Sequence, residues 1–460
     1  MLSLLGFLTV GVILVLLLTN RVAAVVALAG VPVVAGFVAG FSPEEVGEFV
    51  GEGLGDVAGV TAMFVFAIAY FGVQRDAGMF DPIIDRIVRF AGNTPSTVCL
   101  ATTLLACAAH LDGAGATTFL ITIPAMLPIF DRLGMSRLVL ATCVGLGAGV
   151  MNLLPWGGPT ARASTTTGVP VNDLWVPLIP AQIAGVVTAL VIAWLLGRRE
   201  RRRIAAAAET TEAVAVGAGG GPTGRPVPSS GGSGSAGTGG EDHHDSGEDL
   251  RRPRLFWFNI ALTVAVVGCL VAAVAPPEML FLVALVIALV VNYPGLKRQT
   301  ARIEAHAKGA MLMATTLLAA GVFLGILEGS GMIEAMATTA ADAIPSGAAP
   351  ALPLIVGVLG VPLSLLFGPD AFYFGVLPVL TSVGEQFGVS GAAIAQAALL
   401  GEETVGFPIS PLTGSFYLLV GLSGVEIGKH IRHLIGWAWL ASIVMLAVAL
   451  ATGAIPVWSS

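Results

Sequence analysis

Four short polar segments interrupt an otherwise apolar chain, and their residue types are those that bind ions. They read "HLDGAGATTF" (110–119), "NLLPWGGPTARAS" (152–164), "FGPDAFYFG" (367–375) and "GEETVGFPISPLTGS" (401–415). Each segment places glycine or proline beside hydroxyl, amide or carboxylate groups. Glycine lets backbone amides and carbonyls approach a ligand closely, and the start of a helix attracts anions. The four interruptions are therefore predicted to bind ions.

The titratable residues of these interruptions are candidates for proton or cation coupling: His110, Asp112, Asp370, Glu402 and Glu403. A charge near the centre of a bilayer costs about 2.5–3.5 kcal/mol, so a functional role is the first hypothesis for each. The alternatives are that they pair with one another or lie at the membrane interface, and that His110 is a packed neutral imidazole. Glu402 and Glu403 are expected to adjoin on a helix, so only one of them can face a site.

The oxygen-rich composition of the interruptions limits the ions that they can bind. Carboxylate, hydroxyl and carbonyl oxygens suit hard cations such as Mg²⁺ or Ca²⁺, and Asp112 and Asp370 are the candidate metal contacts. Arg162 is the one Lys or Arg in these segments, and a guanidinium suits a carboxylate. Because carboxylates outnumber this arginine, a free trivalent anion would be repelled. An anion that is carried together with a cation or protons fits these residues best.

The composition of the chain indicates an integral membrane protein. Of 460 residues, 55% are apolar and 11% are charged, and the mean hydropathy is +0.88. Soluble domains carry roughly a quarter charged residues. Several stretches with almost no charge approach the ~20 residues that cross a bilayer as a helix. We therefore expect an all-α polytopic protein in the lipid bilayer of the cell (plasma or inner) membrane.

One hydrophilic tract divides the chain. It begins with "RRERRR" at Arg198, continues through a segment rich in Gly, Ser and Pro, and ends in "RRPR". Such a composition cannot bury enough apolar surface to fold, so a disordered linker is predicted. The predicted domains are a first transmembrane repeat at 1–197, a linker at 198–253 and a second repeat at 254–460.

The two halves are similar in sequence. "FGVQRDAGMF" resembles "LGILEGSGMI", which matches Gly72 with Gly325 and Gly78 with Gly331 at an offset of 253 residues. Pro124 likewise matches Pro378 at an offset of 254. Each half also shows the same order of segments: full spans, an amphipathic stretch, two short apolar legs and a span that breaks. Legs of about 15 residues suit a re-entrant hairpin, which is tolerated where protein or a water-filled cavity surrounds it.

Five net crossings per half would make the second repeat inverted with respect to the first. The positive-inside rule agrees with this topology, because 21 of the 22 Lys and Arg then lie on the side of the linker. The exception is Arg162. The linker is therefore predicted to be cytoplasmic and both termini to lie outside.

Inverted repeats with broken helices are typical of secondary transporters. No nucleophile–base pair, phosphate-binding loop or nucleotide-binding fingerprint is visible, so neither an enzyme nor a nucleic-acid partner is expected. A cation/proton antiporter is the strongest competing class, since it would also use membrane-buried aspartates. It would not need Arg162 or the hydroxyl-rich breaks.

Three longer segments resemble a known family. "HLDGAGATTFLITIPAMLPIFDRLGM", "GVMNLLPWGGPTARA" and "LLGEETVGFPISPLTGSFYLLVGLSGVEIGKHIRH" are similar to the citrate–metal–proton symporter (CitMHS) family of the ion transporter superfamily. The resemblance implies cotransport of citrate, complexed with a divalent metal such as Mg²⁺ or Ca²⁺, with protons, and no permanently bound cofactor. Related carboxylate transporters also imply a homodimer in which a transport domain moves against a scaffold, as in an elevator mechanism.

In those relatives the hairpin tips and broken helices bind the substrate. By position this implies substrate contacts from Thr117, Thr118, Asn152, Gly157, Gly158, Pro159, Thr160, Arg162, Ser410 and Thr413. The Ser-Asn-Thr tip motif of the relatives is replaced here by "LDGAGATT" and "FGPDAFYF". Proton or metal coupling is therefore favoured, and a Na⁺-coupled di- or tricarboxylate transporter is the alternative within the superfamily. The residues leave open the preferred metal, the number of protons and the exact carboxylate.

Overall fold

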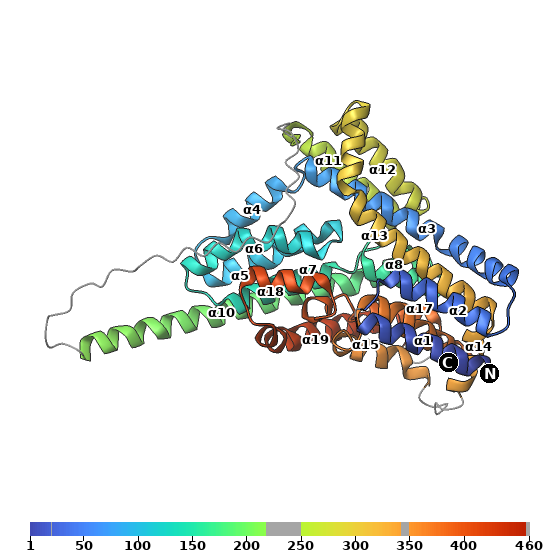
Figure 1. Cartoon of the computed structure of the whole chain (residues 1–460). Coiled ribbons are helices and arrows are strands. Elements are labelled where there is room, and N and C mark those ends of the chain that lie inside the picture. The colour runs from blue at the N-terminus through green and yellow to red at the C-terminus, as the bar shows by residue number, and fades with distance from the viewer. Residues whose placement is uncertain (20, 218–249, 342–348, 457–460) are drawn as a thin grey trace.

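The computed structural model describes residues 1–19, 21–217, 250–341 and 349–456 (Figure 1). In these residues the chain forms helices joined by turns and contains no strand, which confirms the predicted all-α fold. Of the predicted linker at 198–253, residues 218–249 lie outside the described part. The structure differs from the prediction at the start of the linker, because the helix that contains Arg198 continues to Gly217.

The first half of the chain begins with three helical segments, continues with a hairpin and a broken helix, and ends with a long helix. Its elements are α1 (Leu2–Leu18), η1 (Val26–Gly30), α2 (Val31–Val38), α3 (Pro43–Asp76), α4 (Asp81–Ala91), α5 (Pro95–Ala109), η2 (His110–Asp112), α6 (Gly115–Arg132), α7 (Arg137–Met151), α8 (Gly158–Thr167), α9 (Val171–Trp175), η3 (Val176–Leu178) and α10 (Ile179–Gly217).

The second half repeats this order. Its elements are η4 (Pro253–Leu255), α11 (Phe256–Val271), α12 (Pro277–Asn292), α13 (Leu296–Gly329), α14 (Met332–Ala341), η5 (Ala349–Ala351), α15 (Leu352–Leu363), η6 (Ala371–Val376), α16 (Leu377–Gln386), α17 (Gly391–Leu399), η7 (Phe407–Ile409), α18 (Gly414–Ser423) and α19 (Ile427–Ala451).

Two pairs of corresponding helices agree in length, and the residues that follow one of these pairs agree in backbone conformation. Helices α3 and α13 each contain 34 residues, and α8 and α18 each contain 10. The matched glycines Gly78 and Gly331 follow α3 and α13, and both adopt a positive φ, at 78° and 70°. A left-handed residue ends a helix, and glycine adopts this conformation without steric cost. These features support a structural repeat, while its inversion across the membrane stays a prediction.

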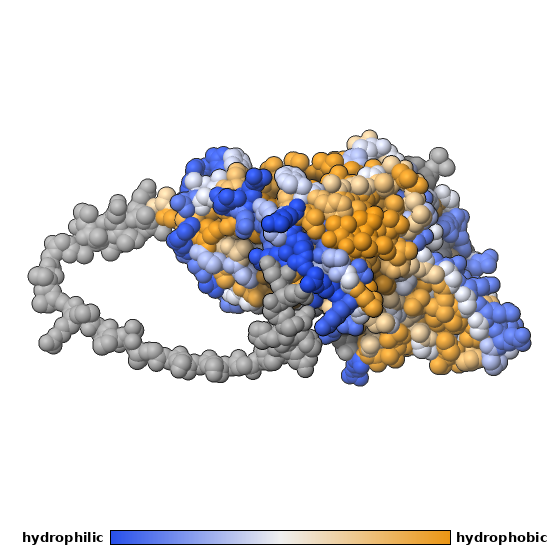
Figure 2. Space-filling view, turned by 90° about the horizontal axis from the view of Figure 1, so that it is seen from above, coloured by the Kyte–Doolittle hydropathy of each residue, from blue (hydrophilic) through white to orange (hydrophobic). Residues whose placement is uncertain are grey.

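Five helices are long and apolar enough to cross a membrane: Pro43–Asp76, Val171–Ala206, Pro253–Val271, Leu296–Gly329 and Ile427–Ala451. Several shorter apolar helices accompany them. Figure 2 shows broad hydrophobic areas on the surface, with hydrophilic residues gathered in separate patches. A surface of this kind suits a protein surrounded by lipid, in agreement with the predicted polytopic membrane protein.

Helices α3 and α13 lie side by side, and glycines allow their backbones to touch (Figure 1). A Cβ atom added at Gly53 would collide with the carbonyl oxygen of Gly321, and one added at Gly325 would collide with that of Phe49. Small residues permit such close packing between helices in membranes, where van der Waals contact drives association. This glycine seam joins the two halves of the chain.

We expect Gly325→Ala to destabilise the protein, because the new methyl group meets backbone that cannot move aside. Overpacking of this kind costs about 1–3 kcal/mol. Size-exclusion chromatography of the detergent-solubilised protein should show a smaller monodisperse peak. A thermal unfolding measurement should give a lower melting temperature. Gly55→Ala is the matched control, because a Cβ atom added at Gly55 on α3 meets nothing within 4 Å. Equal peaks and melting temperatures for the two variants would contradict the seam.

Candidate functional site

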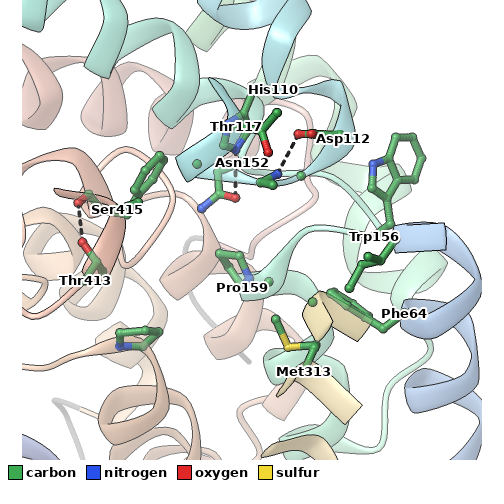
Figure 3. Close-up of a pocket in the computed structure, with 18 of the residues that line it drawn as sticks. Phe64, His110, Asp112, Thr117, Asn152, Trp156, Pro159, Met313, Thr413 and Ser415 are labelled. Atoms are coloured by element: carbon green, nitrogen blue, oxygen red, sulfur yellow. Dashed lines mark hydrogen bonds between the residues drawn. The ribbon is translucent and has the colours of Figure 1, made fainter. Parts of the chain in front are cut away.

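A cavity of about 680 Å³ lies where the four interruptions meet α3 and α13 (Figure 3). Both helices that were predicted to break do so, because α7 ends at Met151 before α8 begins, and α17 ends at Leu399 before α18 begins. Asp112 and Asp370 both line this cavity, as expected for two hairpin tips that approach each other. The cavity is the candidate substrate site.

The first hairpin tip fixes Asp112 through its own backbone. The chain leaves η2 through Gly113, which has a φ of 73°, and Asp112 Oδ1 accepts a hydrogen bond of 2.9 Å from the amide of Ala114. The other carboxylate oxygen, Oδ2, lies 3.3 Å from Nη1 of Arg75 at the end of α3. The Asp112 side chain is only 7% exposed, whereas that of Arg75 is 35% exposed. The aspartate is therefore enclosed, and its cationic partner faces the open cavity.

A chain of hydrogen bonds connects this tip to both broken helices. His110 is fully buried, with Nδ1 2.8 Å from the Thr118 hydroxyl. Its Nε2 lies 3.1 Å from Asn152 Oδ1 (Figure 3). The amide nitrogen of Asn152 donates to the backbone carbonyl of Glu403. Two hydrogen bonds through Asn152 thus link His110 to the break of the second half.

The second tip forms an ion pair with the first broken helix. Arg162 Nε on α8 lies 2.7 Å from Asp370 Oδ1, and the two side chains are 12% and 24% exposed. The structure explains why Arg162 departs from the positive-inside pattern. It lies within α8 and lines the cavity, so it is no ordinary residue of an outer loop.

Glu402 and Glu403 do not adjoin on a helix, which corrects the sequence prediction. They lie in a turn after α17, and Glu403 has a φ of 54°. This left-handed residue sends the two carboxylates in different directions. Glu403 lines the cavity, whereas Glu402 accepts a hydrogen bond of 2.9 Å from the hydroxyl of Ser364 in the packed interior.

Three helices begin at the cavity with glycine: α6 at Gly115, α8 at Gly158 and α18 at Gly414. At none of these three starts does a side chain cap the first amides. The first turn of a helix presents unsatisfied N–H groups and the positive end of the helix dipole. The wall of the cavity is therefore suited to anions at three places.

Most of the residues predicted for the site line this cavity. They are His110, Asp112, Thr117, Asn152, Gly158, Pro159, Arg162, Asp370, Glu403 and Thr413. Five others lie behind the wall: Gly157, Thr118, Thr160, Glu402 and Ser410. Of these, Thr118 supports His110, and Gly157 precedes α8 at a place where a Cβ atom would lie 2.6 Å from the carbonyl oxygen of Asn152. Their predicted substrate contacts would have to be indirect.

The sequence motifs do not include the part of the wall that α3 and α13 supply. Arg75 and His306 both line the cavity, and His306 Nε2 lies 2.8 Å from Asp76 Oδ2. Phe64 and Trp156 add apolar surface (Figure 3). No interruption of an apolar stretch marks Arg75, His306 or Phe64, and charges at the ends of long apolar helices are ordinarily placed at the membrane surface.

A second, smaller cavity of about 420 Å³ lies at the other end of α8. Its described lining includes Asp56, Glu328 and Glu385 together with the last residues of α8, Thr165 to Thr167. Asp56 and Arg75 lie on the same helix about 28 Å apart along its axis, so the two cavities contact different parts of α3. The first turns of α8 face the large cavity, and its last turn faces the acidic one.

A helical membrane protein in which broken helices and hairpin tips enclose one polar cavity is, by class, a secondary transporter. The comparisons with known proteins agree. Residues 5–401 match the model of the family described as citrate transporter, CitMHS. The chain belongs to this citrate transporter family, which confirms the resemblance of its motifs and the expectation that it is not an enzyme.

The relatives extend over the whole chain. It is 40% identical to a citrate transporter of Bacillus subtilis (strain 168), over 99% of this chain and 100% of the relative. It is 37% identical to a Mg(2+)/citrate complex secondary transporter of the same organism, again over 99% of this chain and 100% of the relative. The solved YdaH transporter of Alcanivorax borkumensis has a TM-score of 0.54 at 15% identity, over 90% of this chain and 87% of that one, and is similar in fold alone.

Proposed function

We propose that the protein is a secondary active transporter that carries citrate as a complex with a divalent metal ion, in symport with protons. The observation that carries this proposal is that anion-binding and cation-binding groups line the same cavity. Arg162 and three uncapped helix starts suit carboxylates, and Asp112, Asp370 and Glu403 suit cations. A ligand of a single sign would meet repulsion from part of this wall.

The metal ion enters this proposal as part of the substrate. Within the described residues, no three His, Cys, Asp or Glu side chains lie close enough to hold a metal ion by themselves. A Mg²⁺ ion usually keeps several waters and takes one or two protein carboxylates. Citrate would supply the remaining oxygen ligands, while Asp112 and Asp370 contact the ion from the two hairpin tips.

His110 is suited to carry a proton. Since the Asn152 amide nitrogen donates to Glu403, its Oδ1 accepts from Nε2 of His110. The Thr118 hydroxyl can donate either to Nδ1 or to the carbonyl of Ala114, which is 3.0 Å away. The imidazole can therefore gain a proton at Nδ1 while every hydrogen bond of the network is kept. Asp112 is the other candidate for the same role, and substitution of each residue distinguishes them.

Several features of the transport cycle belong to the same proposal. They are a homodimer, an elevator motion of the hairpins and broken helices against a scaffold, two inverted repeats at 1–197 and 254–460, and a cytoplasmic linker between them with both termini outside. Helices α3 and α13 are unbroken and are held together by the glycine seam, so they suit a part of the scaffold. Both Mg²⁺ and Ca²⁺ are candidate co-substrates.

Uptake of labelled citrate into proteoliposomes tests the proposed function. We expect uptake to require Mg²⁺ or Ca²⁺, to stop when a chelator removes the metal, and to be driven by a proton gradient directed inward. Liposomes without protein are the control. Uptake that follows a Na⁺ gradient without a divalent metal would instead identify a Na⁺-coupled carboxylate transporter. Cation-driven proton flux in the absence of citrate would identify an antiporter.

A further inference from the structure

The cavity contains a second arginine that no sequence motif singled out. Arg75 approaches the first hairpin tip from the last turn of α3, and its Nη1 lies 3.3 Å from Asp112 Oδ2 and 3.1 Å from the hydroxyl of Thr117. Charge-assisted N–H···O hydrogen bonds are usually 2.7–2.9 Å long. The pair of Arg75 with Asp112 is therefore looser than that of Arg162 with Asp370, which measures 2.7 Å.

The donors of Arg75 are only partly used. Among the described residues, both of its hydrogen bonds are made by Nη1 alone. A guanidinium carries five N–H donors in a planar fork that matches a carboxylate at two points. The side chain is 35% exposed, and it lines the cavity, so its remaining donors can reach a ligand there.

We propose that Arg75 and Thr117 form a second carboxylate-binding subsite, and that the substrate bridges this subsite to Arg162. The inference rests on the proposed function and deepens it, since it names the feature that selects the substrate. Arg75 is supplied by α3 and Arg162 by α8, so the two guanidiniums hold separate walls of one cavity. A ligand with at least two carboxylates can place one at each arginine.

The two ion pairs also explain why the metal and the carboxylates must arrive together. In the structure each arginine has an aspartate from a hairpin tip as its partner. A carboxylate that takes an arginine leaves an aspartate with an uncompensated charge, and this is costly in a mostly enclosed site. A divalent ion carried by the same ligand compensates the aspartates. Free citrate lacks this ion, and the free metal lacks the carboxylates.

The test pairs a protein variant with ligands that lack one carboxylate. Three unlabelled ligands compete with labelled citrate in the presence of Mg²⁺. They are citrate itself, 3-hydroxyglutarate, which lacks the central carboxylate, and 2-methylmalate, which lacks a terminal carboxylate. We expect each analogue to bind the wild type at least about tenfold more weakly than citrate. In Arg75→Gln the affinity for citrate should fall at least about tenfold, and one of the analogues should lose almost nothing, because its missing carboxylate is the one that Arg75 binds.

Two further variants keep the test decisive. Arg89→Gln is the matched control, since Arg89 is exposed on α4 and donates within its own helix. If Arg75→Gln fails to give a monodisperse protein, Thr117→Val is used instead, because it removes the neighbouring hydroxyl. It should lower the affinity for citrate while one of the analogues again loses almost nothing. Unchanged affinity in Arg75→Gln, or an equal loss for all three ligands, overturns the subsite while metal-dependent uptake by the wild type still supports the proposed function. Absence of that uptake in the wild type overturns both.

Discussion

Arg162→Ala should raise the citrate concentration that gives half-maximal uptake by about 30-fold or more. The substitution removes the guanidinium that we assign to a substrate carboxylate, and it leaves Asp370 without the partner that lies 2.7 Å away. Truncating one partner of a buried charged pair costs about 2–5 kcal/mol, and about 2 kcal/mol corresponds to this change in affinity. The measurement is the initial rate of uptake against citrate concentration at constant free Mg²⁺.

The control for this prediction is another arginine with an aspartate partner. Arg137 Nη2 lies 2.8 Å from Asp131 Oδ2, but the two side chains are 47% and 44% exposed. Exposed ion pairs contribute about 0–1 kcal/mol, so Arg137→Ala should leave uptake almost unchanged. Arg162→Lys should lie between the two, because it keeps the charge but loses the planar fork. If Arg162→Ala reaches half-maximal uptake at the same citrate concentration as the wild type, Arg162 does not bind the substrate.

Asp112→Asn should abolish accumulation of citrate against its gradient. An amide oxygen can still accept the hydrogen bond from Ala114, so the shape of the tip is kept and only the titratable charge is lost. Uptake should then stop at equal concentrations inside and outside, and its initial rate should no longer change with external pH. Citrate binding itself should persist, because Arg75 keeps its guanidinium for a carboxylate and the amide oxygen of the new asparagine can still contact the metal ion.

Measurements of this variant separate coupling from binding. Initial uptake at several external pH values reports the coupling, and half-saturation at one pH reports the affinity. Asp131→Asn is the control, because Asp131 is exposed and pairs with Arg137. If Asp112→Asn accumulates citrate with the pH dependence of the wild type, the proton is carried elsewhere, and the same two measurements on His110→Gln decide whether that residue carries it.

The sequence was sufficient for the elements and for most of the cavity. Long apolar runs define the spans, and the glycine- and proline-containing interruptions mark the places where helices stop and polar groups are exposed. Asp112, Arg162, Asp370 and Glu403 stand in those interruptions, and the structure brings all four to one cavity. Their convergence could be expected because a charge in an apolar stretch needs a partner or a polar cavity.

Arg75 could not be recognised by the same reasoning. It follows an apolar run, where a basic residue ordinarily reaches for the headgroup region. The 34 residues of α3 extend over about 51 Å, well beyond the ~30 Å of hydrocarbon, so the sequence does not fix which part of the helix meets the cavity. Only the packing of the first hairpin tip against the end of α3 brings Asp112 beside this arginine.

The turn at Glu402 and Glu403 could not be predicted from the sequence for a different reason. A positive φ is uncommon in residues other than glycine, and Gly401 nearby would be the natural choice for it. In the structure Gly401 packs against Gly360, where a Cβ atom would lie 2.9 Å from the Gly360 Cα. The glycine is thus needed for close packing, and Glu403 adopts the left-handed conformation instead.

The short length of α8 has a consequence for the electrical behaviour of transport. The ends of this helix line the large cavity and the acidic one, and its ten residues extend over about 15 Å, half of the ~30 Å hydrocarbon thickness. Where water fills both cavities, the membrane voltage falls mainly across this thin layer. An elementary charge that crosses 100 mV changes its energy by about 2.3 kcal/mol. In the proposed elevator motion, a charged complex carried with α8 across this layer would therefore gain most of that energy in one short movement. We expect this step to be the one most sensitive to voltage.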